Sequence, residues 1–103
     1  MKILHNIKEV NDAINKDLCL IVAKSHSCTV CNTANRLLEN NVKDLDKIES
    51  YNIYVDDVDE FRGQHSIYAV PTVVIYSNGK ELLRESRFIN YDKIQRLIDL
   101  YTS

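Results

Sequence analysis

Two uninterrupted apolar runs constrain the fold of this 103-residue chain more than any other feature. Leu18–Ala23 reads LCLIVA, and Thr72–Tyr76 reads TVVIY. Short apolar runs of this kind are typical of strands that are covered on both faces of a sheet, as strands between helices are. The chain therefore predicts an α/β fold, with Leu18–Ala23 near the centre of the sheet.

Weaker patterns place further elements around these strands. A short strand is expected at Met1–Leu4, and Asn6 is suited to cap the amphipathic helix that follows it. Tyr51–Val55 alternates aromatic or polar with aliphatic side chains and favours another strand. The acidic segment Asp56–Glu60 suits the start of a short helix that continues to about Tyr68.

The last third of the chain predicts a hairpin and a terminal helix. Asn78-Gly79 is a strong signal for a tight antiparallel turn after Thr72–Tyr76. Asn90 is a possible cap for a helix whose apolar stripe repeats at helical spacing, namely Ile94, Leu97, Ile98 and Tyr101. The predicted order is βαβαβαββα, with a mixed central sheet flanked by helices, and we expect residues 1–103 to form a single domain.

Composition excludes several classes of function. The formal net charge of −2 leaves no basic surplus for nucleic acid. The chain lacks the run of ~20 apolar residues that a membrane span needs, and charged residues within Met1–Val10 argue against a signal peptide. We therefore expect a monomeric cytoplasmic protein that binds neither nucleic acid nor membrane.

Chemistry enters with a CxxC motif, Cys28-Thr29-Val30-Cys31. It follows a polar break after the first apolar run and comes before the helical spacing that ends at Asn40-Asn41, so the pair is expected to open a helix. Residues three apart in a helical turn lie on one face, close enough for a disulfide. The positive end of the helix dipole favours the Cys28 thiolate as nucleophile, and the deeper Cys31 is then the resolving thiol.

The motif alone is only moderately specific, because CxxC also forms half of many zinc sites. Two more ligands would have to come from Cys19, His5, His26 and His65, among which there is no second CxxC or HxxxH pair. No metal is therefore expected. Cys19 lies inside an apolar strand and is expected to be a small buried hydrophobe. Lys24 and His26 lie just before the pair, and either would stabilise the Cys28 thiolate if its side chain turned inward. We expect both to be solvated loop residues.

Pro71 is the one proline in the chain and directly precedes the second apolar run. On its own it is explained by the end of a helix and the start of a strand. Taken together, the apolar strand, the CxxC motif, Val70-Pro71-Thr72 and the Asn78-Gly79 hairpin resemble thioredoxin over nearly the whole chain. The resemblance implies a thioredoxin fold and a cis Val70–Pro71 bond beside the cysteines. It further implies that a substrate segment pairs with the backbone of Val70.

Several positions depart from the thioredoxin pattern. Ser27, Thr29 and Val30 stand where thioredoxins have Trp, Gly and Pro. Val22 stands where the resemblance implies a buried Asp that accepts the proton of the resolving thiol. Arg87 stands where a glycine follows the hairpin, and the absence of a Gly-Gly pair there argues against glutathione as a cofactor; no other cofactor is expected.

Three functions remain open at this stage. The first is a thiol–disulfide oxidoreductase that reduces protein disulfides in cell redox homeostasis, with Cys28 and Cys31 as catalytic residues and Val70 and Pro71 as substrate-binding residues. A thioredoxin-reductase-type protein is a candidate electron donor for it. The second is a binding module that docks a partner at the Val70–Pro71 groove with little catalysis. The third is a disulfide donor or sensor with a more oxidising couple.

Overall fold

The computed structural model describes residues 1–102 of the chain. Its element order is the predicted βαβαβαββα order with one short 3₁₀ helix added, η1 (Leu45–Lys47). The strands are β1 (Lys2–Leu4), β2 (Cys19–Lys24), β3 (Glu49–Tyr54), β4 (Thr72–Ser77) and β5 (Lys80–Ser86). The α-helices are α1 (Ile7–Ile14), α2 (Cys31–Asn41), α3 (Asp59–Gln64) and α4 (Tyr91–Thr102).

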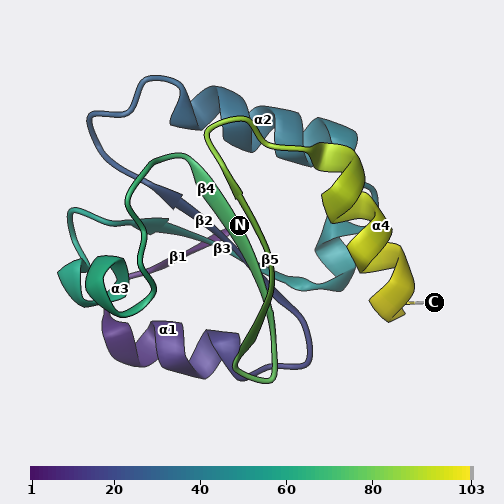
Figure 1. Cartoon of the computed structure of the whole chain (residues 1–103), viewed down its shortest axis with the longest axis horizontal. Helices are drawn as coiled ribbons and strands as arrows, with labels where there is room; N and C mark the ends of the chain where they lie inside the picture. The colour runs from purple at the N-terminus through teal and green to yellow at the C-terminus, as the bar shows by residue number, and fades with distance from the viewer. Residues whose placement is uncertain (103) are drawn as a thin grey trace.

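The five strands form one mixed sheet in the order β1-β3-β2-β4-β5 (Figure 1). β3 pairs in parallel with β1 and β2, whereas β4 is antiparallel to both β2 and β5. The LCLIVA strand therefore lies at the centre, as predicted, and every residue of β2 is buried. The Asn78-Gly79 turn has positive φ at both residues, 52° and 84°, as a tight hairpin requires.

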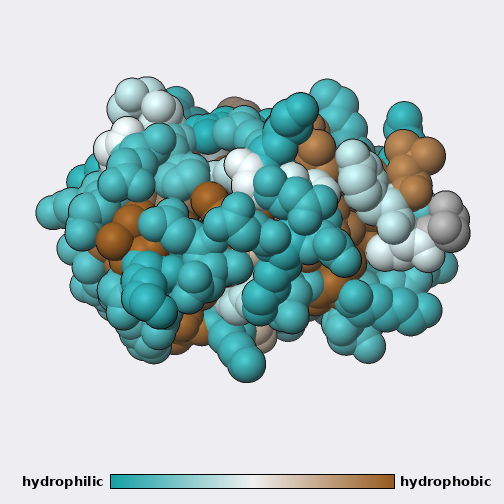
Figure 2. Space-filling view, turned by 90° about the horizontal axis from the view of Figure 1, so that it is seen from below, coloured by the Kyte–Doolittle hydropathy of each residue, from teal (hydrophilic) through white to brown (hydrophobic). Residues whose placement is uncertain are grey.

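Helices cover both faces of the sheet, so the core has two layers (Figure 1). One layer joins α1 and α3 to the sheet through residues such as Val10, Phe61 and Ile53. The other joins α2 and α4 to the opposite face through residues such as Leu38, Ile98 and Ile75. Figure 2, viewed from the side of α1, shows a mainly hydrophilic surface with small separate hydrophobic patches.

Caps stabilise the helix starts that the sequence marks most clearly. The Asn6 side chain accepts a hydrogen bond from the Glu9 N–H at 2.9 Å, and the Asn90 side chain accepts one from the Lys93 N–H at 3.1 Å. Both caps satisfy amide groups that a helix leaves unpaired at its start. Within residues 1–102, no helix is both long and apolar enough to cross a membrane.

Three predictions about helices were wrong in detail. α2 begins at Cys31, so Cys28 lies in the turn before it. α3 ends at Gln64 instead of continuing to Tyr68, because Ser66 adopts a left-handed conformation with φ of 55°. Tyr101 is half exposed, because the apolar stripe of α4 packs mainly through Ile94 and Ile98.

Candidate active site

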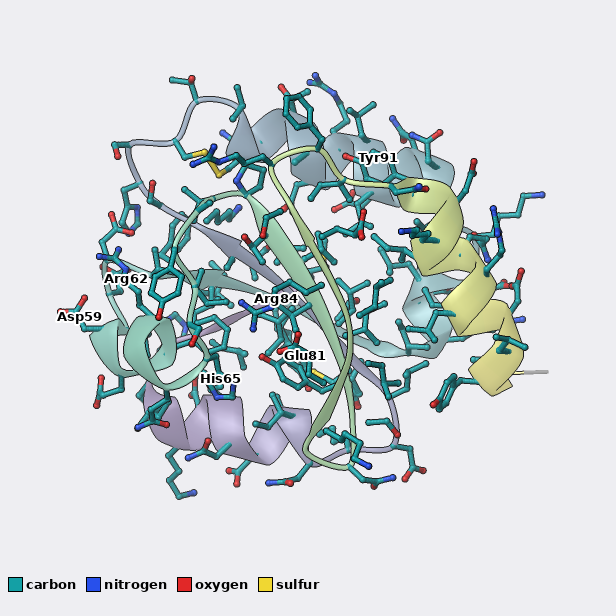
Figure 3. The ribbon with its side chains drawn as sticks, in the orientation of Figure 1. Asp59, Arg62, His65, Glu81, Arg84 and Tyr91 are labelled. Carbon is teal, nitrogen blue, oxygen red and sulfur yellow. A yellow bond between two sulfur atoms is a disulfide. The ribbon has the colours of Figure 1, made fainter. Side chains whose placement is uncertain are left out.

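Cys28 and Cys31 form a disulfide at the start of α2, with their Cα atoms 5.5 Å apart (Figure 3). Cys31 is 1% exposed, whereas Cys28 is only partly buried. A partner sulfur approaching from solvent therefore reaches Cys28 first. Cys28 is thus the more accessible cysteine of the pair.

A turn, and not the helix itself, presents Cys28. The Cys28 N–H donates to the Ser25 carbonyl oxygen at 3.2 Å, and the first bond of α2 runs from the Ala34 N–H to the Val30 carbonyl oxygen at 3.0 Å. Because Cys28 is bonded to the first residue of α2, its sulfur still lies at the amino-terminal end of the helix. Unpaired amides there stabilise a thiolate when the pair is reduced.

The Val70–Pro71 peptide bond is cis, in agreement with the resemblance. The Pro71 carbonyl accepts from the Arg87 N–H at 2.8 Å, and the Thr72 hydroxyl donates to the Ala69 carbonyl at 2.6 Å. These bonds tie the loop before β4 to the end of β5. Among the described residues, neither the N–H nor the C=O of Val70 has a hydrogen-bond partner, so both can pair with an extended segment.

Two depressions in the surface are shared by the turn at residues 25–28, here called the cysteine turn, and the loop at residues 65–71, here called the proline loop. In one, of about 380 Å³, Val70 lies with Ser25 and Ser27, the residues just before Cys28. In the other, of about 780 Å³, Pro71 lies with Val30, the residue just before Cys31. The structure thus brings the two predicted parts of the site together, although Val70 lies far from Cys31 in the sequence.

Lys24 is not the solvated loop residue that was expected, whereas His26 is an exposed loop residue, as expected, but has several partners. Lys24 belongs to β2 and is 7% exposed, and its Nζ lies 5.0 Å from the ring centroid of Tyr54. The His26 ring stacks on the same tyrosine at a centroid distance of 4.0 Å. Its Nε2 lies 2.8 Å from an oxygen of Asp57, and the His26 N–H donates to the Asp56 carboxylate at 3.1 Å.

This cluster fixes the chain directly before Cys28. The hydrogen bond with Asp57 raises the pKa of His26, although burial partly opposes the rise. Tyr54 ends β3, and Asp56 and Asp57 follow it in the loop before α3. The cluster therefore anchors the cysteine turn to a segment of the chain that sequence analysis had assigned to a helix start.

The sheet below α2 lacks the buried carboxylate that the resemblance implies. Val22 is 1% exposed, and its register partner on β3 is Asn52. The buried polar side chains of residues 1–102 are Lys24, Asn52 and Thr72, so none is acidic. The side-chain oxygens of Asn52 and of Asn35 on α2 are buried without a hydrogen-bond partner. The proton of Cys31 must therefore leave by another route.

Cys19 lies at the start of β2 and packs in the layer of α1 and α3, on the face away from α2. It is buried and free, and burial raises the pKa of its thiol to about 12. A thiol of this kind is an inert core residue at neutral pH. Within residues 1–102 no group of three or more His, Cys, Asp and Glu side chains is placed to hold a metal ion.

Sequence analysis missed a polar network around Arg84, which binds the start of the loop between α3 and β4 (Figure 3). Arg84 on β5 donates to both carboxylate oxygens of Glu81, at 3.1 and 2.7 Å. It also donates to the carbonyl oxygens of His65 and Ser66, at 2.7 and 2.9 Å, just after α3. The His65 Nδ1 is hydrogen bonded to the Tyr76 hydroxyl at 3.1 Å, and burial, assisted by the charge of Arg84, lowers the pKa of His65.

A β-bulge makes this network possible, which is why no sequence pattern indicated it. Residues three apart in a regular strand point to opposite faces. Here the pairing of β4 with β5 shifts between Ile75 and Tyr76, so that Glu81 and Arg84 meet on one side. The bulge has no signature in the sequence of β5 (KELLRES).

Comparisons with known proteins agree with this geometry. No protein-family model matches the chain. The thioredoxin-like protein YdfQ of Bacillus subtilis (strain 168) is 29% identical to this chain, in an alignment that covers 95% of this chain and 92% of that protein. The thioredoxin of Fasciola hepatica superposes with a TM-score of 0.81 at 26% identity and covers 98% of this chain and 99% of its own.

A thioredoxin of Malassezia sympodialis superposes with a TM-score of 0.84 at 19% identity, over 100% of this chain and 91% of its own. Similarity at this level of identity concerns the fold alone, and it agrees with the mixed five-stranded sheet and its helices. The chain therefore has the thioredoxin fold, and its bonded cysteine pair and its similarity to a thioredoxin-like protein support a thiol–disulfide oxidoreductase.

Proposed function

We propose that the chain reduces disulfide bonds in proteins, with Cys28 and Cys31 as the catalytic residues and Val70 and Pro71 as substrate-binding residues. One observation carries the proposal. The bonded pair joins an accessible sulfur to a buried one beside a cis proline whose preceding residue has free backbone groups. A metal site does not need that arrangement, whereas exchange with a peptide disulfide does.

The proposed reaction has two exchange steps. The Cys28 thiolate attacks one sulfur of the substrate disulfide, that bond breaks, and the leaving thiolate takes a proton from water. Cys31 then loses its proton and attacks Cys28, which releases the second substrate thiol. Two electrons pass from the cysteine pair to the substrate, and the protein ends with the Cys28–Cys31 bond.

A second dithiol must then reduce the protein again, and a thioredoxin-reductase-type electron donor fits this role. The direction follows from the cytoplasmic location that we propose, since a reducing compartment keeps the pair in its dithiol form. We also propose that the protein acts as a monomer. A pure binding module would need the same groove but no sulfur chemistry, so sulfur chemistry separates the two hypotheses.

The first test measures insulin reduction with dithiothreitol as electron source. Cys28→Ser should abolish the catalysed rate, and Cys31→Ser should accumulate a mixed disulfide with the substrate that mass spectrometry detects. Cys19→Ala is the matched control and should retain the rate, because Cys19 lies on the other face of the sheet. A Cys28→Ser protein as active as the parent would refute the proposal.

Redox titration against glutathione then gives the direction. A Cys28–Cys31 couple near the potential of the cytosolic pool or below it favours the reductase. A couple near that of strong oxidants, about 100 mV or more above the pool, favours the disulfide donor. A pair that does not exchange with glutathione in this titration leaves only the binding module.

A further inference from the structure

The larger depression beside the cysteines is a groove between α2 and residues 87–92. Its volume is about 780 Å³, and one end of it is formed by Val30 and Pro71. A segment that pairs with Val70 must continue past Pro71 in one of its two directions, because Val70 borders the smaller depression and Pro71 the larger one. The groove is therefore placed to receive the residues on one side of the disulfide of a substrate.

Exposed apolar side chains line this groove. Val30 is 59% exposed and Leu37 is 40% exposed, both on the side of α2. On the other side Phe88 is 91% exposed, the highest value among the large hydrophobic residues of the described chain. A ring held in solvent beside a half-open groove gains by packing against an apolar side chain of a partner.

Arg87 forms the rim of the groove next to Pro71. It has a positive φ of 64°, which disfavours residues other than glycine. Its N–H bonds to the Pro71 carbonyl oxygen at 2.8 Å, which fixes the residue against the proline loop. The resemblance implies glycine here, so this chain places a long cation where the family leaves open space.

The guanidinium of Arg87 has no ion-pair partner within residues 1–102, in contrast to that of Arg84, which binds Glu81. Asp92 also lines the groove. That carboxylate lies in the first turn of α4, where the amino-terminal end of the helix dipole offsets its charge. The groove thus holds one charge of each sign, and the positive one, Arg87, is the one fixed beside Pro71.

We propose that this groove is a specificity site that selects substrates with an acidic residue and an apolar residue close to the reactive cysteine. Arg87 binds the carboxylate, and Phe88 with Val30 and Leu37 packs against the apolar side chain. The partner is thus an extended acidic segment of the protein whose disulfide is reduced. This inference rests on the proposed function, because it concerns the substrates of the same cysteine pair.

The experiment uses pairs of short peptides that carry one cysteine in mixed disulfide with 2-mercaptoethanol. The two peptides of a pair are identical except at one position, which is Asp in one peptide and Lys in the other. This position lies two to four residues before the cysteine in the first pair and two to four residues after it in the second pair. The parent protein should have a kcat/KM about three- to tenfold higher for the Asp peptide of one pair, and added salt should reduce this preference. Hydroxyethyl disulfide, which has neither charge nor peptide, reports the chemistry alone.

Two variants test Arg87 and one controls for charge. Arg87→Gly suits the positive φ and should lose the preference without loss of rate on hydroxyethyl disulfide. Arg87→Glu should invert the preference. Arg96→Glu makes the same charge change on α4, at an exposed residue outside the groove, and should leave the preference as it is. Phe88→Ser should lower kcat/KM by the same factor for both peptides of a pair.

A measurement of peptide binding separates this inference from the proposed function. The Cys28→Ser/Cys31→Ser double variant has no sulfur chemistry, so fluorescence anisotropy with labelled, cysteine-blocked peptides measures docking alone. If the Asp peptide binds more tightly than the Lys peptide, and Arg87→Glu reverses this order, the specificity site is supported even if the parent reduces nothing. Equal binding of the Asp and Lys peptides in every pair overturns it even if the parent is an efficient reductase.

Discussion

His26 shows how one side chain connects the cysteine turn to the loop after β3. Its ring stacks on Tyr54, its Nε2 contacts Asp57, and its backbone N–H donates to the carboxylate of Asp56. The contact with Asp57 favours the protonated ring and raises the pKa of His26 above the usual value of about 6.5. The turn that presents Cys28 is therefore held most firmly when the ring is charged.

The first prediction concerns the pH dependence of this contact. Since the pKa of His26 is higher in the folded chain than in the unfolded one, its stabilisation is complete below about pH 6.5 and is lost as pH rises through the folded pKa. His26→Gln, which carries no charge, should therefore lower the urea midpoint more at pH 5.5 than at pH 9. The measurement is the difference between the parent and variant midpoints at each pH.

Taking this difference removes the contribution of His65. The lowered pKa of His65 gives a pH dependence of stability in the opposite direction, and this contribution is common to both proteins. His5→Gln is the control, because the side chain of His5 is exposed and has no partner among residues 1–102. It should change the midpoint by the same small amount at both pH values. A His26→Gln effect that is independent of pH would show that stacking on Tyr54, and not charge, holds the turn.

At the scale of elements, the β4–β5 hairpin is anchored at its tip to the loop before β2. The Gly79 N–H donates to the Ile14 carbonyl oxygen at 2.7 Å, and the Asn78 N–H to that of Lys16 at 2.8 Å. Gly79 has a φ of 84°, and a Cβ atom at this position would lie 2.8 Å from the side-chain oxygen of Asn15. The positive φ is what favours glycine in the turn, because the end of the Asn15 side chain can move aside.

The second prediction compares the two glycines of the chain. Gly79→Ala should destabilise the fold by about 1–2 kcal/mol, the cost of a left-handed conformation in a residue with a Cβ atom. Gly63→Ala is the matched control within α3, where nothing lies within 4 Å of the new atom. That change should instead stabilise by up to about 1 kcal/mol, because alanine favours helix. Equal urea midpoints for the two variants would contradict the turn geometry.

Elements whose pattern depends on burial were predictable from the sequence. The Leu18–Ala23 and Thr72–Tyr76 runs became β2 and β4, each within a residue of its expected limits, because strands covered on both faces leave no polar positions. The cysteine pair was also identified from its residues, because it depends on residue type at a fixed spacing. The cis Val70–Pro71 bond was expected only from the resemblance to thioredoxin.

Features that depend on distant contacts were not predictable. The start of α2 depends on a turn closed by Ser25 and on the cluster of His26 with Asp56 and Asp57, which the fold brings together across 30 residues. The Arg84 network depends on a bulge in β5. Lys24 is expected from the sequence to lie in a loop, yet it pairs with Tyr54 of β3 and its Nζ lies over that ring. Tertiary contacts outweigh local pattern at all three places.

At the scale of the whole molecule, one sheet serves two core layers. Ile21 and Val22 are neighbours on β2, yet Ile21 belongs to the layer of α1 and α3 and Val22 to that of α2 and α4. Since alternate residues of the same strands line both layers, neither layer can lose its packing without disturbing the strands that form the other. The site lies at the end of β2, so it depends on both.

The last prediction is that the chain unfolds as one cooperative unit, as expected of a single domain. Ile53 and Ile75 are both 0% exposed and belong to opposite layers. Ile53→Val and Ile75→Val should each cost about 0.5–1.5 kcal/mol and shift the same transition, and the double variant should show the sum to within about 0.5 kcal/mol. Far-ultraviolet dichroism and tyrosine fluorescence, for which the chain has six tyrosines, should give coincident urea curves. Two separate transitions, each sensitive to one variant alone, would mean that the layers fold independently and that the cysteine turn depends on only one of them.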